Sequence, residues 1–176
     1  MRESSEQVDY LKNRLSMIKD ELTPLVRGSH DQAKEALHEL YQRAKKICDD
    51  YWSVFRENNL SQYNIPSGQR LIGRFGPNVQ LHKLNEKVYI EWRSYAPSRT
   101  GKREKIHGVR VRPRRGLNYL PSQFIKATPW ELKMIVEAEE KFKLLRQLIE
   151  IFHAVNKGLK KYRLLESEEI REGESQ

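Results

Sequence analysis

The sequence predicts an α+β fold in which an N-terminal helical hairpin, a small antiparallel β-sheet and a long C-terminal helix follow one another along 176 residues. Three observations lead to this prediction. Apolar residues recur every three or four positions in both terminal regions, as they do in helices that bury one face. Apolar and polar residues alternate in a middle segment, as they do in a half-buried strand. Pro and Gly residues cluster between these regions, where the chain is expected to turn.

The helical hairpin is predicted over residues 1–58. Ser4 and Gln7 are spaced as a capping box at the start of the first helix. Pro24 is expected to end or kink that helix, and Gly28 to form a turn before a second helix that starts at Ser29. Because the connection is short, an antiparallel hairpin is the simple expectation, although the same stripes also fit a swapped or intermolecular coiled coil. The stripes are Val8, Leu11, Leu15, Ile18, Leu22 and Leu25, then Ala33, Leu37, Leu40, Ala44, Ile47, Tyr51 and Val54.

A basic loop and a small β-sheet are predicted over residues 59–127. Residues 58–78 contain several Pro and Gly residues and are expected to be a loop. Two strands are expected after it, at 88–95 and 106–112, with a short third strand at 79–84. In the first strand, Val88, Ile90 and Trp92 suit a buried face, whereas the exposed face would carry Tyr89, Glu91, Arg93 and Tyr95.

A long helix is predicted over residues 128–165. Thr128 suits the cap, Pro129 the first helical position, and Glu131 closes a capping box. The apolar stripe runs for about 30 residues, or about 45 Å of helix, so part of it must pack on other helices or on a second chain. Gly158 is expected near its end, and the acidic tail at 166–176 is expected to be disordered. The stripe is Leu132, Ile135, Phe142, Leu145, Ile149, Phe152 and Leu159.

Positive charge is concentrated in the middle of the chain. The whole sequence has 33 Lys and Arg against 24 Asp and Glu, a net charge of +9. Residues 70–126 hold 14 of these basic residues and only three acidic ones, whereas the rest of the chain holds 19 basic and 21 acidic residues. A polyanion is therefore the expected partner, because segregated positive charge attracts one.

The candidate nucleic-acid-binding residues are mostly arginines, whose planar fork binds phosphate oxygens and guanine edges in pairs. We expect Arg93, Arg110 and Arg112 to point from the outer face of a β-ribbon into the DNA major groove. Turn residues would hold the phosphate backbone. A solubilised edge strand, an acidic protein or a lipid headgroup are alternative explanations of the charge. The full set is Arg93, Tyr95, Arg99, Lys102, Arg103, Lys105, Arg110, Arg112, Arg114 and Arg115.

The sequence predicts neither an enzyme nor a membrane protein. It has no P-loop ending in Lys-Ser/Thr, no pair of histidines at metal-ligand spacing, and a single cysteine, Cys48. We therefore expect no catalytic residue, no metal and no cofactor. Residues 1–20 are highly charged and no apolar run approaches the roughly 18 residues of a membrane span. The cytoplasm is the expected location.

The order of features from Glu86 to Tyr162 resembles the MobI-type conjugative transfer proteins of integrative conjugative elements and related plasmids. The features are the strand Lys87–Arg93, the Gly-Lys-Arg turn at 101–103, the segment Tyr119–Ala127, and Trp130-Glu-Leu at the start of a long helix. Trp52–Phe55 also agrees with it. The resemblance covers about half of the chain. It implies an auxiliary factor that binds at or near the origin of transfer and helps the relaxase assemble there without cutting DNA.

The expected partners are double-stranded DNA and a relaxase. A homodimer is also expected, because the apolar stripes are too long for a small monomeric core. Three rival functions remain open at the level of sequence. The first is RNA binding, and the second is a coiled-coil adaptor for which the basic loop is incidental. The third is an enzyme that cleaves or integrates DNA.

Overall fold

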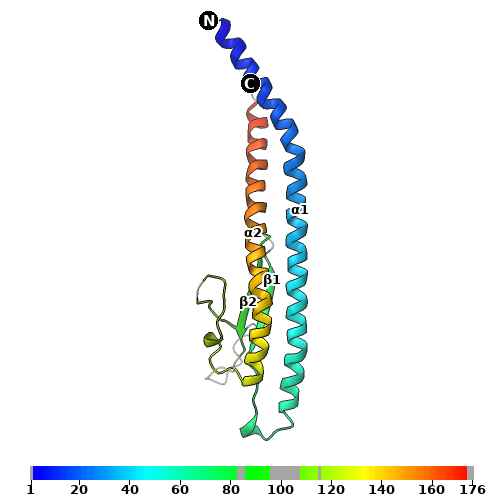
Figure 1. Cartoon of the computed structure of the whole chain (residues 1–176), viewed down its shortest axis with the longest axis vertical. Helices are drawn as coiled ribbons and strands as arrows, with labels where there is room; N and C mark the ends of the chain where they lie inside the picture. Colours follow the sequence, from blue (N-terminus) through cyan, green and yellow to red (C-terminus); the bar gives the residue numbers. More distant parts are fainter. Residues whose placement is uncertain (1, 83–85, 96–107, 115, 174–176) are drawn as a thin grey trace. The chain divides into compact units, whose positions relative to one another are not determined.

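The computed structural model describes residues 2–82, 86–95, 108–114 and 116–173, and it confirms the predicted α+β class (Figure 1). The helices are α1 (Arg2–Gln62) and α2 (Pro129–Gly173), and short 3-10 turns lie at Ser67–Gln69 and Pro121–Gln123. The strands are β1 (Phe75–Leu81), β2 (Val88–Ser94) and β3 (Val109–Arg110). The chain divides into two compact units, one of Met1–Ala36 with Phe152–Gln176 and one of Leu37–Ile151, and the sheet belongs to the second.

The predicted N-terminal hairpin is wrong, because α1 runs without a break from Arg2 to Gln62. It passes through Pro24 and Gly28, which were expected to separate two helices. A proline inside a helix costs about 3 kcal/mol and a glycine about 1 kcal/mol, but both penalties are local. Ser29, which directly follows Gly28, could cap a new helix, but apolar residues recur at helical spacing on both sides of it, and the helix continues through this point.

Helix α2 begins as predicted and ends later than predicted. The Glu131 N–H donates to Thr128 Oγ1 (3.4 Å) and the Thr128 N–H donates to Glu131 Oε2 (3.1 Å), which is the expected capping box. The helix then continues through Gly158 to Gly173. The tail that was expected to be disordered is therefore helical as far as Gly173.

The sheet is antiparallel with strand order β1-β2-β3. The predicted third strand exists as β1 but begins at Phe75, inside the expected loop. Trp92 lies opposite Pro77 on β1, and Arg93 lies opposite Arg110 on β3. In the described part of the predicted strand 106–112, only Val109–Arg110 is paired as a strand.

Trp92 is the centre of the core of this unit and is fully buried. Its ring makes edge-to-face contacts with Tyr51 of α1 (5.3 Å), Phe124 of the loop before α2 (5.3 Å) and Phe142 of α2 (6.1 Å). Val88 and Ile90 are buried beside it, as the alternation predicted. Both helices and the loop thus contact the inner face of β2.

Two buried carboxylates of α2 fasten the sheet and the loop to this helix. Glu131 accepts hydrogen bonds from the backbone N–H groups of Arg74 and Phe75, both at 2.5 Å, in addition to that of Thr128. Glu139 accepts from Trp92 Nε1 (2.9 Å), from the Tyr119 N–H (3.1 Å) and from the Arg146 guanidinium. Burial raises the pKa of both carboxyl groups, and these donors oppose that effect.

Arg146 is the buried counter-ion of Glu139. Its side chain is almost fully buried, and burial lowers its pKa. The guanidinium also donates to the Ile90 carbonyl (3.4 Å) and lies 5.1 Å from the centre of the Tyr119 ring. It therefore joins α2 to the backbone of β2 and to the loop.

We predict that Arg146→Met lowers the free energy of unfolding by roughly 3–5 kcal/mol near pH 7.5, because it leaves a buried carboxylate without its cation. The loss should be smaller near pH 5. The pKa of Glu139 is already raised above 4.5 by burial, and removing Arg146 raises it further. A carboxyl with a raised native pKa stabilises the fold below its unfolded pKa, and this stability is lost as the pH rises through the native pKa.

Urea unfolding followed by tryptophan fluorescence at the two pH values measures this difference. Arg43→Met is the matched control, because Arg43 pairs with Glu39 on an exposed helix face and its loss should change stability by less than about 0.5 kcal/mol. An equal loss for Arg146→Met at both pH values would show that the charge of Glu139 is not the cause.

Candidate nucleic-acid interface

The outer face of the sheet carries a carboxylate among the predicted arginines. Residues 89, 91 and 93 of β2 point away from the buried Val88, Ile90 and Trp92, because successive side chains of a strand alternate. The pairing of Arg93 with Arg110 then brings an arginine of β3 to the same face. Glu91, which was expected to be exposed, is only 8% exposed beneath them.

Glu91 binds two of the predicted DNA-binding arginines. Its Oε1 accepts from Arg93 Nη2 (2.6 Å) and Nε (3.0 Å), and its Oε2 pairs with Arg110 Nε (2.9 Å). Asn78 of β1 donates to the same carboxylate at 3.3 Å. The Arg93 side chain is 20% exposed and that of Arg110 is 59% exposed. Arg93 is therefore mainly an internal partner of Glu91, whereas Arg110 presents most of its guanidinium to solvent.

Tyr95 is held at one end of this face by Trp52 of α1. The two rings meet edge to face at 5.3 Å, and Trp52 Nε1 donates to the Pro77 carbonyl (3.0 Å). Trp52 can lie there because β1 has a glycine beneath it, and a Cβ at Gly76 would come within 2.2 Å of the indole. Burial raises the pKa of Tyr95 above its ordinary value. Its ring remains partly exposed beside the arginines.

Arg110, Arg112 and Arg114 line a groove of about 560 Å³ between the segment 109–114 and the turn 122–125. Phe75 and Ser94 lie between these two walls. The side-chain amide of Gln123 donates to the Arg112 carbonyl and so ties one wall to the other. None of the described residues that line this groove is acidic. The groove carries Arg110, Arg112 and Arg114 with Val109, Val111, Ser122, Gln123 and Ile125.

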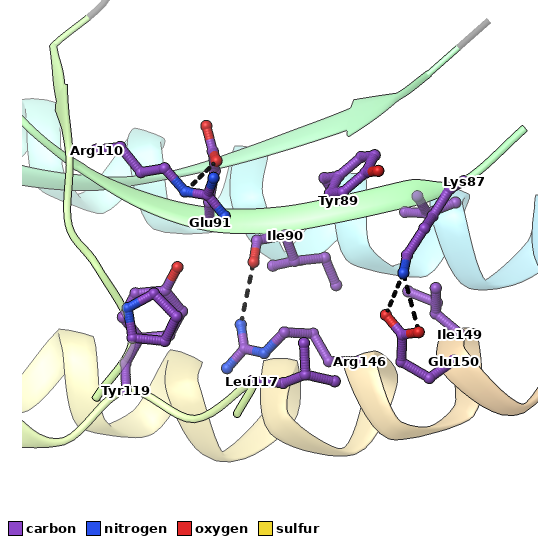
Figure 2. A pocket seen from close by; sticks show the side chains of 12 residues that line it. Lys87, Tyr89, Ile90, Glu91, Arg110, Leu117, Tyr119, Arg146, Ile149 and Glu150 are labelled. Atoms are coloured by element: carbon purple, nitrogen blue, oxygen red, sulfur yellow. Dashed lines mark hydrogen bonds and ion pairs between the residues drawn. The ribbon is translucent and has the colours of Figure 1, made fainter. Parts of the chain in front are cut away.

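A second, smaller cavity of about 110 Å³ lies between β2 and α2 (Figure 2). Lys87 forms an ion pair with Glu150 (2.8 Å) there, and Arg146 reaches the Ile90 carbonyl across it. Its cations thus already have carboxylate partners within the unit. Tyr119, which follows the basic segment in the sequence, is buried under Arg146 and does not present its ring to solvent.

The remaining predicted contacts lie outside the described residues. These are Arg99, Lys102, Arg103, Lys105 and Arg115, and they stay predictions.

Reasoning from the sequence missed the opposite wall of the groove and the role of Glu91. The pairing of Glu91 with Arg93 could have been predicted, because residues two positions apart in a strand point to the same face. No sequence pattern indicates the other wall of the groove, which is formed by Ser122, Gln123 and Ile125, since only the folded loop brings it beside residues 109–114.

Within the described ranges, no three His, Cys, Asp or Glu side chains gather as a metal site would require. In the same ranges, neither helix has an apolar stretch long enough to cross a membrane.

Comparison with known proteins identifies one family. A family model described as MobI protein matches residues 40–160, which include the C-terminal part of α1 from residue 40, the whole sheet and most of α2. Both the outer face of β2 and the arginine-lined groove lie inside the matched region. Neither a curated protein nor a solved structure matches the chain.

Proposed function

The chain belongs to the MobI family of conjugative mobilisation proteins, and we propose that it serves this process as a DNA-binding auxiliary protein that cuts no DNA itself. It would act in the cytoplasm, bind double-stranded DNA at or near the origin of transfer, and help a relaxase assemble there. The observation that carries the proposal is the groove beside β3, whose described lining has three arginines and no acidic residue. A surface of this kind suits a polyanion.

The described arginines of the predicted site would make different contacts with DNA. Arg110 and Arg112 are exposed and would contact base edges, while Arg114 would contact phosphate. Arg93 would position Arg110 through their shared partner Glu91 rather than contact DNA itself. Lys102 and Arg103 would hold the phosphate backbone.

We predict that the chain binds an origin-containing duplex more tightly than a random duplex, with an affinity that falls by roughly 10³ to 10⁵ between 50 and 200 mM salt if six to ten phosphates are contacted. Arg110→Ala or Arg112→Ala should reduce the preference for the origin. Lys102→Ala or Arg103→Ala should weaken binding to both duplexes equally.

Fluorescence anisotropy with the two duplexes at the two salt concentrations measures both effects, and a duplex RNA competitor separates DNA binding from RNA binding. Lys141→Ala, an exposed cation of α2 outside the groove, is the control. Equal loss on both duplexes for all four variants would reject the division between base and phosphate contacts. Binding that ignores salt would reject the electrostatic interface altogether.

We also predict that Glu91→Gln strengthens DNA binding, roughly three- to tenfold at about 50 mM salt, because it removes a negative charge from beneath Arg93 and Arg110 while keeping a hydrogen-bond acceptor. A gain in affinity cannot arise from unfolding. The gain should shrink at about 200 mM salt. Glu137→Gln, which removes an exposed carboxylate of α2 outside the groove, should leave affinity nearly unchanged. Unchanged affinity for Glu91→Gln would mean that DNA does not approach this face.

We propose further that the chain works as a homodimer. Within the unit that contains the sheet, Leu144 and Ile151 of α2 are exposed and lie seven residues apart, which places them on one face of the helix. A dimer would cover these apolar side chains. We therefore expect sedimentation to give a dimer at tens of micromolar, and Leu144→Glu with Ile151→Glu to give a monomer. A monomeric native chain at that concentration would contradict the proposal.

A further inference from the structure

Two apolar side chains stand in solvent beside the arginines of the groove. Val109 and Ile125 are each 74% exposed, one on each wall. Burial of branched apolar side chains normally stabilises a protein. Val109 and Ile125 are left unburied on the same small surface and contribute little of this stabilisation. Their position among cations distinguishes them from scattered exposed residues, which need no explanation.

Ile125 is held outward by a well-anchored turn. Phe124, the residue before it, is buried and packs edge to face on Phe75 and on Trp92, both at 5.3 Å. The Ala127 N–H closes the turn onto the Phe124 carbonyl (3.0 Å). The turn is rigid at its base and fixes where Ile125 points.

The backbone of this turn is also strained. Lys126 has a φ of +73°, a conformation that residues other than glycine rarely adopt. Such strain persists only where the surrounding structure imposes it, and it clusters at functional positions. Here it follows directly after the exposed Ile125 and adds another exposed cation beside the groove.

The chemistry of the surface favours DNA over a protein as the partner of these side chains. An uncharged apolar partner would remove the arginines from water without supplying a counter-charge, which costs free energy. Of the three, only Arg110 pairs with a described carboxylate, Glu91, and the described lining of the groove itself contains no acidic residue. Duplex DNA combines both properties, since its stacked bases are apolar and its phosphates are charged. Proteins that kink DNA insert Ile, Leu or similar side chains between base steps while cations hold the phosphates.

We infer that Ile125, supported by Val109, is a wedge that unstacks one base step of the duplex held by Arg110, Arg112 and Arg114. This inference rests on the proposed function and adds to it that the bound DNA is kinked. A base step that is already weakened by a mismatch is easier to open. The native protein should therefore prefer it.

Two duplexes of about 30 base pairs test the inference, one fully paired and one identical except for a single central mismatch. Anisotropy gives the affinities, and energy transfer between dyes at the two ends reports the kink. We expect the native chain to bind the mismatched duplex roughly tenfold more tightly and to shorten the end-to-end distance of both. Ile125→Ala should bind the two duplexes equally and leave them straight, whereas Ile125→Leu should keep the preference and the kink.

Leu60→Ala is the matched control, because Leu60 is exposed to a similar extent but lies at the end of α1 outside the groove. It should behave as the native chain, and thermal melting should show that all three variants fold. Equal binding of both duplexes by the native chain, or a preference retained by Ile125→Ala, would overturn the wedge, leave DNA binding intact and assign the apolar walls to a protein contact. Failure to bind either duplex would overturn the proposed function and the wedge with it.

Discussion

The arrangement of the sheet depends on two carboxylates that α2 buries beneath it. β3 contributes only Val109–Arg110, so the sheet is little more than the β1–β2 hairpin, and a two-stranded hairpin is marginally stable unless it packs on other elements. Glu131 fixes the start of β1 through two backbone N–H groups, and Glu139 fixes β2 through the indole of Trp92. A buried carboxylate costs several kcal/mol unless donors surround it. Glu131 accepts from the start of β1 and from its own helix cap, and Glu139 accepts from β2, from the loop at Tyr119 and from Arg146 of α2. These hydrogen bonds therefore position β1, β2 and the loop against α2.

Much of the fold could be predicted because local chemistry decided it. The Thr128–Glu131 capping box and the burial of Val88, Ile90 and Trp92 each depend on a local sequence pattern, and both formed as expected. The hairpin failed because Pro24 and Gly28 were weighed as helix breakers, although their local penalties do not stop a helix that has a strong pattern on both sides. The start of β1 at Phe75 could not be predicted, since the partner that fixes it, Glu131, is 56 residues away.

The candidate site shows that the number of arginines in a segment does not by itself give the number that are free to bind a ligand. The sequence predicts a group of arginines in and around the second strand, and Arg93 and Arg110 of that group lie on β2 and β3, but the sequence could not assign their partners. Glu91 offsets part of the positive charge of Arg93 and Arg110. It also orients both guanidinium groups, because it forms an ion pair with each. An arginine loses side-chain conformational entropy when it binds a ligand. Where an internal carboxylate already orders the arginine in the free protein, less entropy is lost on binding. The net positive charge is thus reduced, while the remaining charge is better oriented.

The anchoring of the core and the shape of the groove are connected through one loop. The loop residue Tyr119 donates its N–H to Glu139, and Phe124 packs on Trp92 and Phe75. The turn that carries Ile125 is therefore fixed by the same core that fixes β2, and the Gln123 side chain joins it to the arginine-bearing wall. The Gln123 hydrogen bond and the packing of Phe124 both hold the two walls of the groove together. Under the proposed function, walls held together in this way would favour recognition of DNA by its shape and its ability to deform, because the duplex would have to adapt to the groove.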